Sequence, residues 1–351
     1  MIDIAVVAGD GIGPEVVAEA VKVLKIAAAR YGFGLGLHDI ELGADRYLRT
    51  GELLPDSTLR ELRGYDAILF GAVGDPRVKP GILEKDILLK LRFELDLYIN
   101  LRPAKLYPGA PCPLVGKGPA DVDMAIVREN TEGLYVGQGS FERRGEKDEI
   151  ALQLSRNTRF GVERCVRYAF EYARKNHRQR VTFCGKTNVL NFAHDLWMRV
   201  FEAVRAEYAG IEANYAHVDA LCMFLVKNPE NYDVIVTDNM FGDIVSDLAA
   251  IIQGGLGVAA GANLNPAGVS MFEPIHGSAP PFKGQGVVNP IAAINAGRML
   301  LDHLGQTEAA AAIDRAVART IARDLKGLDV HKMGCSTGAA GDLIAGYVRG
   351  E

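Results

Sequence analysis

The chain has 351 residues, of which 48% are hydrophobic and 24% charged, with a formal net charge of -5. Because single hydrophobic cores stop growing at roughly 250–300 residues, this length predicts two domains. No apolar run approaches the roughly 18 residues that a membrane span needs, and the mixed charges leave no broad basic surface, so we expect neither a membrane protein nor a nucleic-acid-binding protein.

Five cysteines are scattered along the chain, odd in number and never in a CxxC pair, which argues against a disulfide framework and a zinc site. The N-terminal residues enter an apolar run directly, without a basic lead or a cleavage site of small residues. We therefore expect a cytoplasmic protein that binds a small molecule.

The first predicted unit is a strand, a turn and a helix. Residues 2–8 form an apolar run, 9–13 a glycine-rich turn, and Pro14 begins an alanine-rich helix that extends to about Arg30. The turn invites comparison with the dinucleotide motif GxGxxG, but its third glycine would fall on Pro14, so the Rossmann fingerprint fails. The turn is either structural or a close approach of backbone to a ligand.

Short apolar runs then alternate with helical patterns. The runs cover 65–71, 123–127, 181–184 and 233–237, and the longest helical patterns cover 159–176 and 289–304. This alternation predicts an α/β chain with a largely parallel sheet. The polar segment 131–158 is strand-like in its second half, and it is either an arm that reaches a partner subunit or a plain surface loop.

Three arginines, Arg92, Arg102 and Arg128, occur near predicted strand ends. Guanidinium groups match carboxylates bidentately, so three that converge would bind a di- or tricarboxylate. If they do not converge, each is an ordinary surface ion-pair member.

Two aspartates follow the apolar run 233–237. Asp243 and Asp247 are four residues apart, so on a helix both carboxylates project from one face. At the carboxyl end of a strand such a pair favours a bound cation, and oxygen ligands suit Mg²⁺ or Mn²⁺. Asp219 is a possible third ligand, whereas the alternative for Asp247 is a solvated helix position.

Lys186 and Tyr135 are the candidate proton-transfer groups. A lysine beside a metal ion has a lowered pKa and can act as a base, and a tyrosine can protonate an enolate. Taken alone, each would be assigned to the surface or to packing. The stretch 272–290 concentrates glycine, proline, Glu273, His276 and Lys283, and it is either a loop that binds a phosphate-bearing ligand or a loop without function.

Six motifs occur in a fixed order: GDGIGPE, LRPAK, RENTEG, KTNVL, FGDIVSDLA and FEPIHGSAP. Together they resemble the β-decarboxylating dehydrogenases, a family that includes isopropylmalate, isocitrate, homoisocitrate and tartrate/D-malate dehydrogenases. The resemblance spans nearly the whole chain and implies metal-dependent, NAD-linked oxidative decarboxylation of a 2-hydroxy acid with a malate-like core.

The resemblance also implies a fold: the isopropylmalate/isocitrate dehydrogenase-like, non-Rossmann α/β fold with two domains. Residues 1–98 and 254–351 would form a cofactor-side domain, and 99–253 a substrate and dimerisation domain whose arm, 131–158, clasps a second subunit. The expected assembly is a homodimer in which active sites are shared.

Carried over by position, the family implies four groups of site residues. Arg92, Arg102 and Arg128 would hold the substrate carboxylates beside Leu88 and Leu89, and Asp219, Asp243 and Asp247 would bind Mg²⁺ or Mn²⁺. Lys186 would relay the proton of the 2-hydroxyl and Tyr135 would protonate the enolate, with Lys186 and Asp219 supplied by the neighbouring subunit. The residues expected to line NAD are Ile12, Asn188, Gly254, Gly255, Glu273, His276, Gly277, Ser278, Ala279 and Asn289.

Substrate choice depends on the helix before Arg92. Isocitrate enzymes carry a serine and an asparagine where this chain has Asp86 and Leu88, and homoisocitrate enzymes an arginine where it has Leu89. Two leucines favour an alkyl group, because a third carboxylate there would remain unpaired. We therefore expect conversion of 3-isopropylmalate to 2-oxoisocaproate, as in leucine biosynthesis. The tartrate/D-malate enzymes are the alternative, since they share both leucines and resemble RENTEG, PCPL and GANLNP.

The cofactor and the enzyme class each have a rival. NAD-linked relatives carry an aspartate, and NADP-linked ones often a lysine, where this chain has Pro281. We expect NAD, although Lys283 could meet a 2′-phosphate. A metal-dependent phosphotransferase or hydrolase would also want paired aspartates and arginines, but no GxxxxGK[ST] loop is present. A non-catalytic binding protein on the same fold is the other rival.

Overall fold

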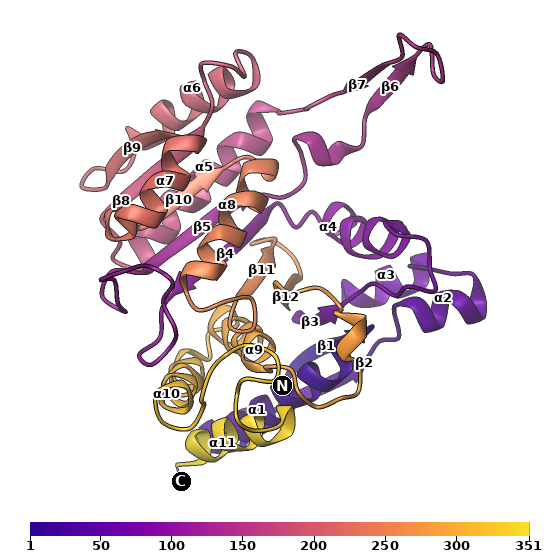
Figure 1. Ribbon diagram of the computed structural model, residues 1–351, viewed down its shortest axis with the longest axis vertical. Helices are drawn as coiled ribbons and strands as arrows, with labels where there is room; N and C mark the ends of the chain where they lie inside the picture. Colours follow the sequence, from indigo (N-terminus) through magenta and orange to yellow (C-terminus); the bar gives the residue numbers. More distant parts are fainter. Residues whose placement is uncertain (351) are drawn as a thin grey trace.

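The computed structural model describes residues 1–350 and contains one large sheet with helices on both faces, together with a separate hairpin (Figure 1). The strands are β1 (Ile2–Gly9), β2 (Leu35–Asp39), β3 (Ala67–Ala72), β4 (Ile99–Lys105), β5 (Asp123–Glu129), β6 (Gly139–Glu142), β7 (Ile150–Gln153), β8 (Arg180–Gly185), β9 (Glu212–His217), β10 (Val234–Thr237), β11 (Ala260–Leu264) and β12 (Ser270–Pro274). The α-helices are α1 (Gly13–Tyr31), α2 (Ala44–Thr50), α3 (Asp56–Leu62), α4 (Lys90–Glu94), α5 (Arg159–Lys175), α6 (Ala193–Arg205), α7 (Val218–Lys227), α8 (Asn239–Ile252), α9 (Ile291–His303), α10 (Thr307–Arg323) and α11 (Thr337–Arg349). Short helical turns are η1 (Glu84–Leu89), η2 (Leu134–Val136), η3 (Pro229–Asn231) and η4 (Pro280–Phe282).

The sheet has ten strands in the order β2-β1-β3-β12-β11-β4-β5-β10-β8-β9. Its two ends are parallel, and the antiparallel pairs lie in the middle, where β11 pairs with β12 and β4, and β4 pairs with β5. The predicted α/β class is confirmed. The parallel strands have apolar side chains on both faces because helices cover both faces, as in β3, whose six residues are all buried.

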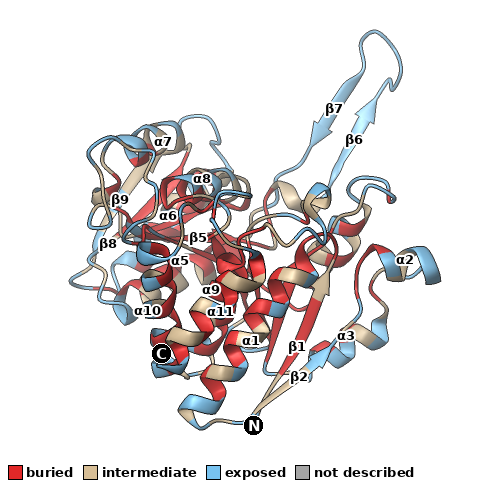
Figure 2. Ribbon diagram, turned by 60° about the horizontal axis from the view of Figure 1, so that its bottom comes forward, coloured by how far each residue is buried: buried red, intermediate tan, exposed pale blue. Residues whose placement is uncertain are grey.

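Alternate residues of a strand enter the cores on opposite faces of the sheet. In β1, Ile4 and Val6 join a core that includes residues of α1, α5, α6 and α9, whereas Ala5 and Val7 join a second core with α3 and α4. Strands β5 and β10 supply a third core beneath α7 and α8. One core therefore runs along one face of the sheet, and the other face carries two separate groups of helices (Figures 1 and 2).

The segment predicted as an arm or a loop contains a hairpin, in which β6 and β7 pair antiparallel outside the main sheet. All residues of both strands are exposed (Figure 2), and they include Phe141, Ile150 and Leu152. The plain-loop alternative is therefore wrong. Contact of the arm with a partner subunit stays a prediction.

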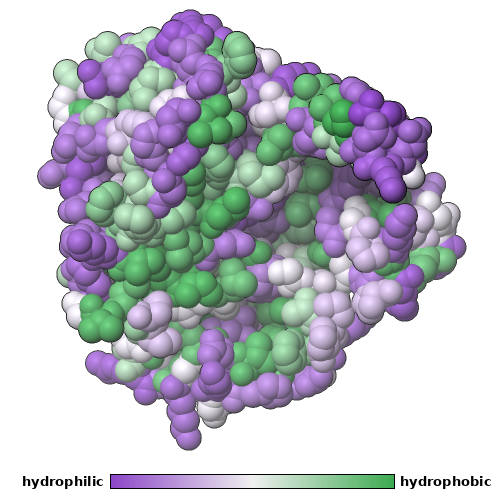
Figure 3. Space-filling model, turned by 45° about the horizontal axis from the view of Figure 1, so that its top comes forward, coloured by the Kyte–Doolittle hydropathy of each residue, from purple (hydrophilic) through white to green (hydrophobic). Residues whose placement is uncertain are grey.

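Large apolar side chains are also exposed on α7 and α8, and Figure 3 shows apolar areas on the molecular surface beside a hollow. Exposed apolar area of this kind marks an interface more often than free surface. The exposed apolar residues of the two helices are Met223, Phe224, Val226, Ile244 and Ile251.

The expected domain boundaries fall at the start of β4 and just after the end of α8. The sheet continues across this division, because β4 of one proposed domain pairs with β11 of the other. The division into two domains stays a prediction. Among residues 1–350, no helix is long and apolar enough to cross a membrane.

Candidate active site

The predicted arginines come together above the middle of the sheet, on the face that carries α4 and α8. Arg102 lies in β4, Arg128 near the end of β5 and Arg92 in α4, and all three are buried. Burial and the neighbouring charges of Arg128 and Arg92 lower the pKa of Arg102 to about 10. Burial, followed by the charge of Arg92, also lowers the pKa of Arg128. Such crowding of cations creates a strong attraction for a carboxylate-bearing ligand.

Hydrogen bonds fix the guanidinium groups of Arg128 and Arg102. Arg128 donates to Asn239 Oδ1 from Nε at 2.9 Å and from Nη2 at 2.7 Å. Arg102 Nε donates to Asn100 Oδ1, and its Nη1 donates to Ser246 Oγ, both at 2.6 Å. These contacts pre-organise the groups, which lowers the entropy cost of binding an anion.

Asp243 and Asp247 project from one face of α8 toward these cations. Arg102 lies 3.7 Å from Asp243 Oδ1 and 3.5 Å from Asp247 Oδ1, and Arg128 forms a closer ion pair with Asp243. Burial acts to raise the pKa of Asp243, but the charges of Arg128 and Arg102 outweigh it and the net shift is downward. Burial raises the pKa of Asp247.

Tyr135 joins this group from η2, at the base of the arm. Its hydroxyl donates to Asp243 Oδ2 at 2.9 Å, and its ring lies 5.0 Å from the Arg128 guanidinium carbon. Burial raises the pKa of the phenol, so the group is protonated near neutrality. A phenol held this way can deliver a proton to a ligand bound by the arginines.

Lys186 and Asp219 form a separate pair. Lys186 directly follows β8, and its Nζ lies 2.5 Å from Oδ1 of Asp219 in the first turn of α7. Among residues 1–350, no three His, Cys, Asp or Glu side chains gather closely enough to hold a metal ion. Asp219 therefore does not meet Asp243 and Asp247 within one chain, and their union across a dimer stays a prediction.

The expected helix before Arg92 is present, but its first part is a π-helix. Leu88 and Leu89 occupy the last turn of η1, which runs directly into α4, and both are half-buried. Leu88 packs against the core beneath α3 and α4. π-Helical turns inside helices are frequent at functional sites.

Two segments expected at the cofactor meet beside the first turn of the chain. The backbone N–H of Ile12 donates to the carbonyl of Ser278 at 2.8 Å. A Cβ on Gly11 would lie 1.9 Å from that carbonyl oxygen, so this approach requires glycine. Ala279 follows in the left-handed region, with φ of 39°.

A second group gathers near Leu328. Gly254 and Gly255 both have positive φ, and a Cβ on Gly254 would lie 3.1 Å from the Leu328 side chain. Asn289 is buried, and it donates from Nδ2 to the Leu328 carbonyl at 3.1 Å.

The remaining residues expected at the cofactor differ in their surroundings. Glu273 is buried and occupied: its Oε1 lies 3.2 Å from Arg92 Nη2 and accepts from Asn263 Nδ2 at 2.7 Å. His276 Nε2 is buried without a hydrogen-bond partner, and burial lowers the pKa of the ring. Gly277 is exposed, as is Asn188, two residues after Lys186.

These surroundings fit the two expected groups. Asp243 and Asp247 offer carboxylate oxygens from side chains that are 39% and 63% exposed, which suits a hard divalent cation. The unpartnered Nε2 of His276 lacks a hydrogen-bonding group of the kind that a nucleotide supplies.

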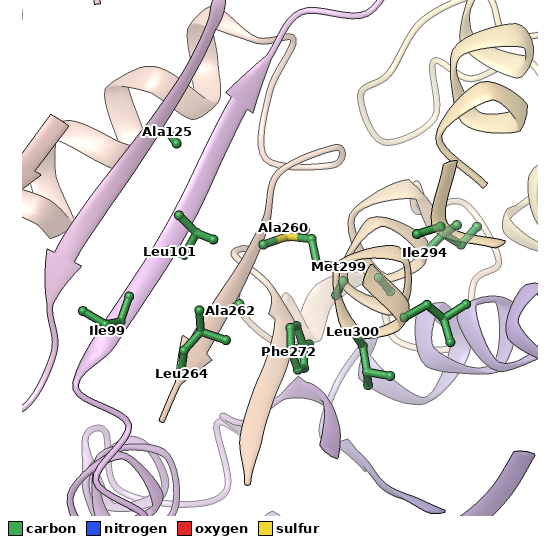
Figure 4. Packing of buried hydrophobic residues seen from close by; sticks show 14 of the residues in the cluster. Ile99, Leu101, Ala125, Ala260, Ala262, Leu264, Phe272, Ile294, Met299 and Leu300 are labelled. Carbon is green, nitrogen blue, oxygen red and sulfur yellow. The ribbon is translucent and has the colours of Figure 1, made fainter. Parts of the chain in front are cut away.

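A cavity of about 430 Å³ lies on the opposite face of the sheet, between α5 and α9. Leu101, Ala262, Phe272 and Met299 line it, and Figure 4 shows these side chains arising from β4, β11, β12 and α9. None of the predicted site residues lines this cavity. The charged groups on the α8 face therefore remain the better candidate for chemistry.

Four residues of the site went unnoticed in the sequence. Asn239 and Ser246 hold the arginines, and Asp238 caps α8 by accepting from the Phe241 N–H at 3.0 Å. The capping role of Asp238 could have been identified, because an aspartate directly before a helix is a common N-cap. The fourth residue is His194, whose Nε2 lies 2.9 Å from Asp238 Oδ2, and no sequence pattern marks it as part of the site.

Comparison with known proteins assigns the chain to a family of decarboxylating dehydrogenases. A model of the isocitrate/isopropylmalate dehydrogenase family matches residues 3–344, and the chain belongs to that family.

Among curated proteins, the chain is 52% identical over 346 residues to the 3-isopropylmalate dehydrogenase of Thermobifida fusca, covering 98% of this chain and 97% of that protein. It is 50% identical over 344 residues to the Mycobacterium leprae protein of the same name, covering 97% and 98%. Among solved structures, isocitrate dehydrogenase from Methylococcus capsulatus has a TM-score of 0.90 at 37% identity and covers 99% of this chain and 100% of its own. The TT0538 protein from Thermus thermophilus has a TM-score of 0.89 at 36% identity, covering 99% and 68%.

Proposed function

We propose that this protein converts 3-isopropylmalate to 2-oxoisocaproate and CO₂ as a metal-dependent, NAD-linked homodimer, a step of leucine biosynthesis. The observation that carries the proposal is the convergence of Arg92, Arg102 and Arg128 on the acids of α8 and on Tyr135. The names of its relatives, which are half identical over nearly the full length, favour 3-isopropylmalate as the substrate.

The three arginines bind the two carboxylates of the malate core and fix its orientation. Leu88 and Leu89 then face the substituent at C3, where an isopropyl group gains from desolvation. A tartrate or D-malate substrate also lacks a third carboxylate, so it is the alternative. Homoisocitrate or another 3-alkylmalate is the second alternative substrate.

Proton transfer is assigned to two side chains. Lys186 relays the proton that leaves the 2-hydroxyl, and Tyr135 donates a proton to C3 of the enolate after CO₂ is lost. NAD would supply the hydride acceptor for C2, and Asp219, Asp243 and Asp247 would hold a Mg²⁺ or Mn²⁺ ion that would supply positive charge beside the C2 oxygen. In this scheme Lys186 and Tyr135 transfer protons, and the substrate loses one carboxylate carbon as CO₂.

A homodimer with shared sites is supported by two features. Lys186 and Asp219 lie together, and within residues 1–350 Asp219 does not join Asp243 and Asp247, which agrees with a site that a second subunit completes. The exposed apolar side chains of the arm, α7 and α8 provide surfaces for the contact. A cytoplasmic location is part of the proposal, and the free thiols of all five cysteines support it.

NAD is the proposed cofactor because Pro281 supplies no cation to a 2′-phosphate. Its carbonyl already accepts from Gln285 Nε2 at 2.6 Å. Lys283 keeps NADP as the alternative. The residues proposed to line the cofactor are Ile12, Gly254, Gly255, Glu273, His276, Gly277, Ser278, Ala279 and Asn289. Asn188, two residues after Lys186, is proposed to line it as well.

The test is a panel of 3-isopropylmalate, D-malate, tartrate, isocitrate and homoisocitrate, each with NAD and with NADP, in the presence of Mn²⁺. We expect the highest kcat/KM for 3-isopropylmalate with NAD, measured as NADH formation with stoichiometric release of CO₂. A higher value for D-malate or tartrate would reassign the substrate. Absence of any reduced cofactor would favour the phosphotransferase, hydrolase or binding-protein alternatives, although the retention of Lys186 and Tyr135 argues against a non-catalytic protein.

A further inference from the structure

A single buried imidazole joins the two parts of the proposed catalytic machinery. His194, in the first turn of α6, is 2% exposed, and its Nδ1 accepts from the backbone N–H of Lys186 at 2.7 Å. Its Nε2 lies 2.9 Å from Oδ2 of Asp238. A backbone N–H can only donate, so Nδ1 carries no proton and Nε2 donates to Asp238.

The second partner, Asp238, controls the start of α8. Its Oδ1 accepts from the Phe241 N–H and caps the helix that carries Asp243 and Asp247, while its Oδ2 is taken up by His194. One carboxylate therefore holds the helix, and one ring holds that carboxylate. Ring, carboxylate and the Lys186 backbone form a chain of three linked groups.

Packing against two aromatic rings also restrains the imidazole. His194 lies between Phe183 and Phe241, with ring centroids 5.9 Å and 5.4 Å away. A Cβ on Gly185 would lie 2.9 Å from His194 Nδ1, so the chain turns tightly around the ring just before Lys186. The parallel pairing of β8 with β10 brings Lys186 and Asp238 to the same edge of the sheet.

We propose that His194 is a positioning residue, which sets the backbone of Lys186 against the capped start of α8 and so determines where the lysine amine and the α8 acids lie. The inference rests on the proposed function, because it assigns Lys186 a proton-transfer role. His194 touches no reacting atom in this scheme. Its loss should lower the rate of chemistry more than substrate affinity, because the hydrogen bonds of the ring go to Lys186 and Asp238 and not to the arginines.

Three variants separate the two hydrogen bonds of the ring. His194→Leu removes both, His194→Asn keeps an acceptor near the position of Nδ1, and His194→Gln keeps a donor near the position of Nε2. Trp197→Phe is the matched control, because Trp197 lies on the same helix, stacks on the same Phe183 ring and donates one partly buried hydrogen bond to Asn157. It touches neither Lys186 nor Asp238 through any of these contacts.

We expect His194→Leu to lower kcat about 10–100-fold, as is typical when a group that orients a catalytic residue is lost. KM for the substrate should change less than about threefold, because binding energy common to ground and transition states is retained. His194→Asn should recover most of the lost rate, whereas His194→Gln should recover less and Trp197→Phe should keep the wild-type kcat. A folded His194→Leu protein with the kcat of the control would overturn the proposal.

Two further readouts keep the inference separable from folding and from the function itself. If His194→Leu does not fold, equal kcat values for the His194→Asn and His194→Gln variants would count against the proposed positioning role. Hydrogen exchange at the Lys186 amide, followed by mass spectrometry on the full-length protein, should be faster in His194→Gln than in His194→Asn. If the wild type oxidises none of the substrates, the proposed function fails, and unchanged exchange at Lys186 in all variants would then reject the role of His194.

Discussion

At the scale of single residues, the ionisable group with the clearest consequence outside the catalytic cluster is Glu129, next to Arg128 at the end of β5. Burial raises the pKa of its carboxyl to about 7, although the N–H groups of Thr131 and Glu132, which donate at 2.8 Å, act in the opposite direction. The folded state therefore holds the Glu129 proton more tightly than the unfolded chain does. This contribution to stability is complete below the ordinary pKa of 4.5 and is lost as the pH rises through 7.

Substitution of Glu129 by Gln should remove that pH dependence. Between pH 4.5 and 7.5, the free energy of unfolding of the wild type should fall by about 3 kcal/mol relative to Glu129→Gln, because a pKa unit corresponds to about 1.4 kcal/mol. Urea unfolding of both proteins at several pH values, at one protein concentration, measures the difference. A difference that stays constant across this range would mean that Glu129 ionises normally in the fold.

At the scale of elements, the arm provides the most direct test of the assembly. Leu152 lies in β7, opposite Ser140 of β6, and 47% of its surface is exposed although it is a large apolar residue. Leu152→Asp places a charge on this surface without removing any contact from the core. We expect the variant to sediment as a monomer and to lose activity, since the proposed site needs two chains.

A control for Leu152→Asp is available at the arm tip. Glu146→Gln changes a charge on the same exposed hairpin without altering an apolar side chain, and it should remain dimeric and active. Analytical ultracentrifugation and the standard assay check both variants. If Leu152→Asp stays dimeric with full activity, the arm does not contribute to the subunit contact.

The sequence identified some strands and missed others. The apolar runs at 2–8, 65–71, 123–127, 181–184 and 233–237 correspond to β1, β3, β5, β8 and β10. Strands β4 and β11 escaped notice because their buried positions carry polar residues. Asn100 donates from Nδ2 to Asn263 Oδ1 at 2.9 Å, and Asn263 in turn donates to Glu273. In β4 and β11, the polar residues of this network interrupt the hydrophobic pattern by which a strand is recognised.

Some features of the candidate site could be predicted from the sequence and others could not. The four-residue spacing of Asp243 and Asp247 on a helix follows from the helical repeat, and it could be predicted. The approach of Arg92, Arg102 and Arg128 could not, because it depends on how α4, β4 and β5 are placed in space. The bridge from Lys186 through His194 to Asp238 joins residues 8 and 44 positions apart, and no sequence periodicity connects them.

At the scale of the whole molecule, the central question is whether one subunit completes the active site of another. Within residues 1–350, Lys186 pairs with Asp219 on α7, whereas Asp243 on α8 pairs with Arg128 and Tyr135. A closed dimer with two-fold symmetry would place the Lys186 pair of each chain against the Asp243 group of its partner. A variant that lacks Lys186 and a variant that lacks Asp243 would then each be inactive alone but would complement each other in a mixed dimer.

Mixing these variants distinguishes shared from self-contained sites. Lys186→Met and Asp243→Asn should each be inactive as homodimers, because each lacks one essential group in both sites. After joint unfolding and refolding, half of the dimers are heterodimers in which one site has both native groups, so activity should recover to about a quarter of the wild-type value. Each variant refolded alone controls for reactivation, and sedimentation confirms that dimers re-form. If the mixture stays inactive, Lys186 and Asp243 serve the same chain, and the separation of the two pairs must be closed by movement within one subunit.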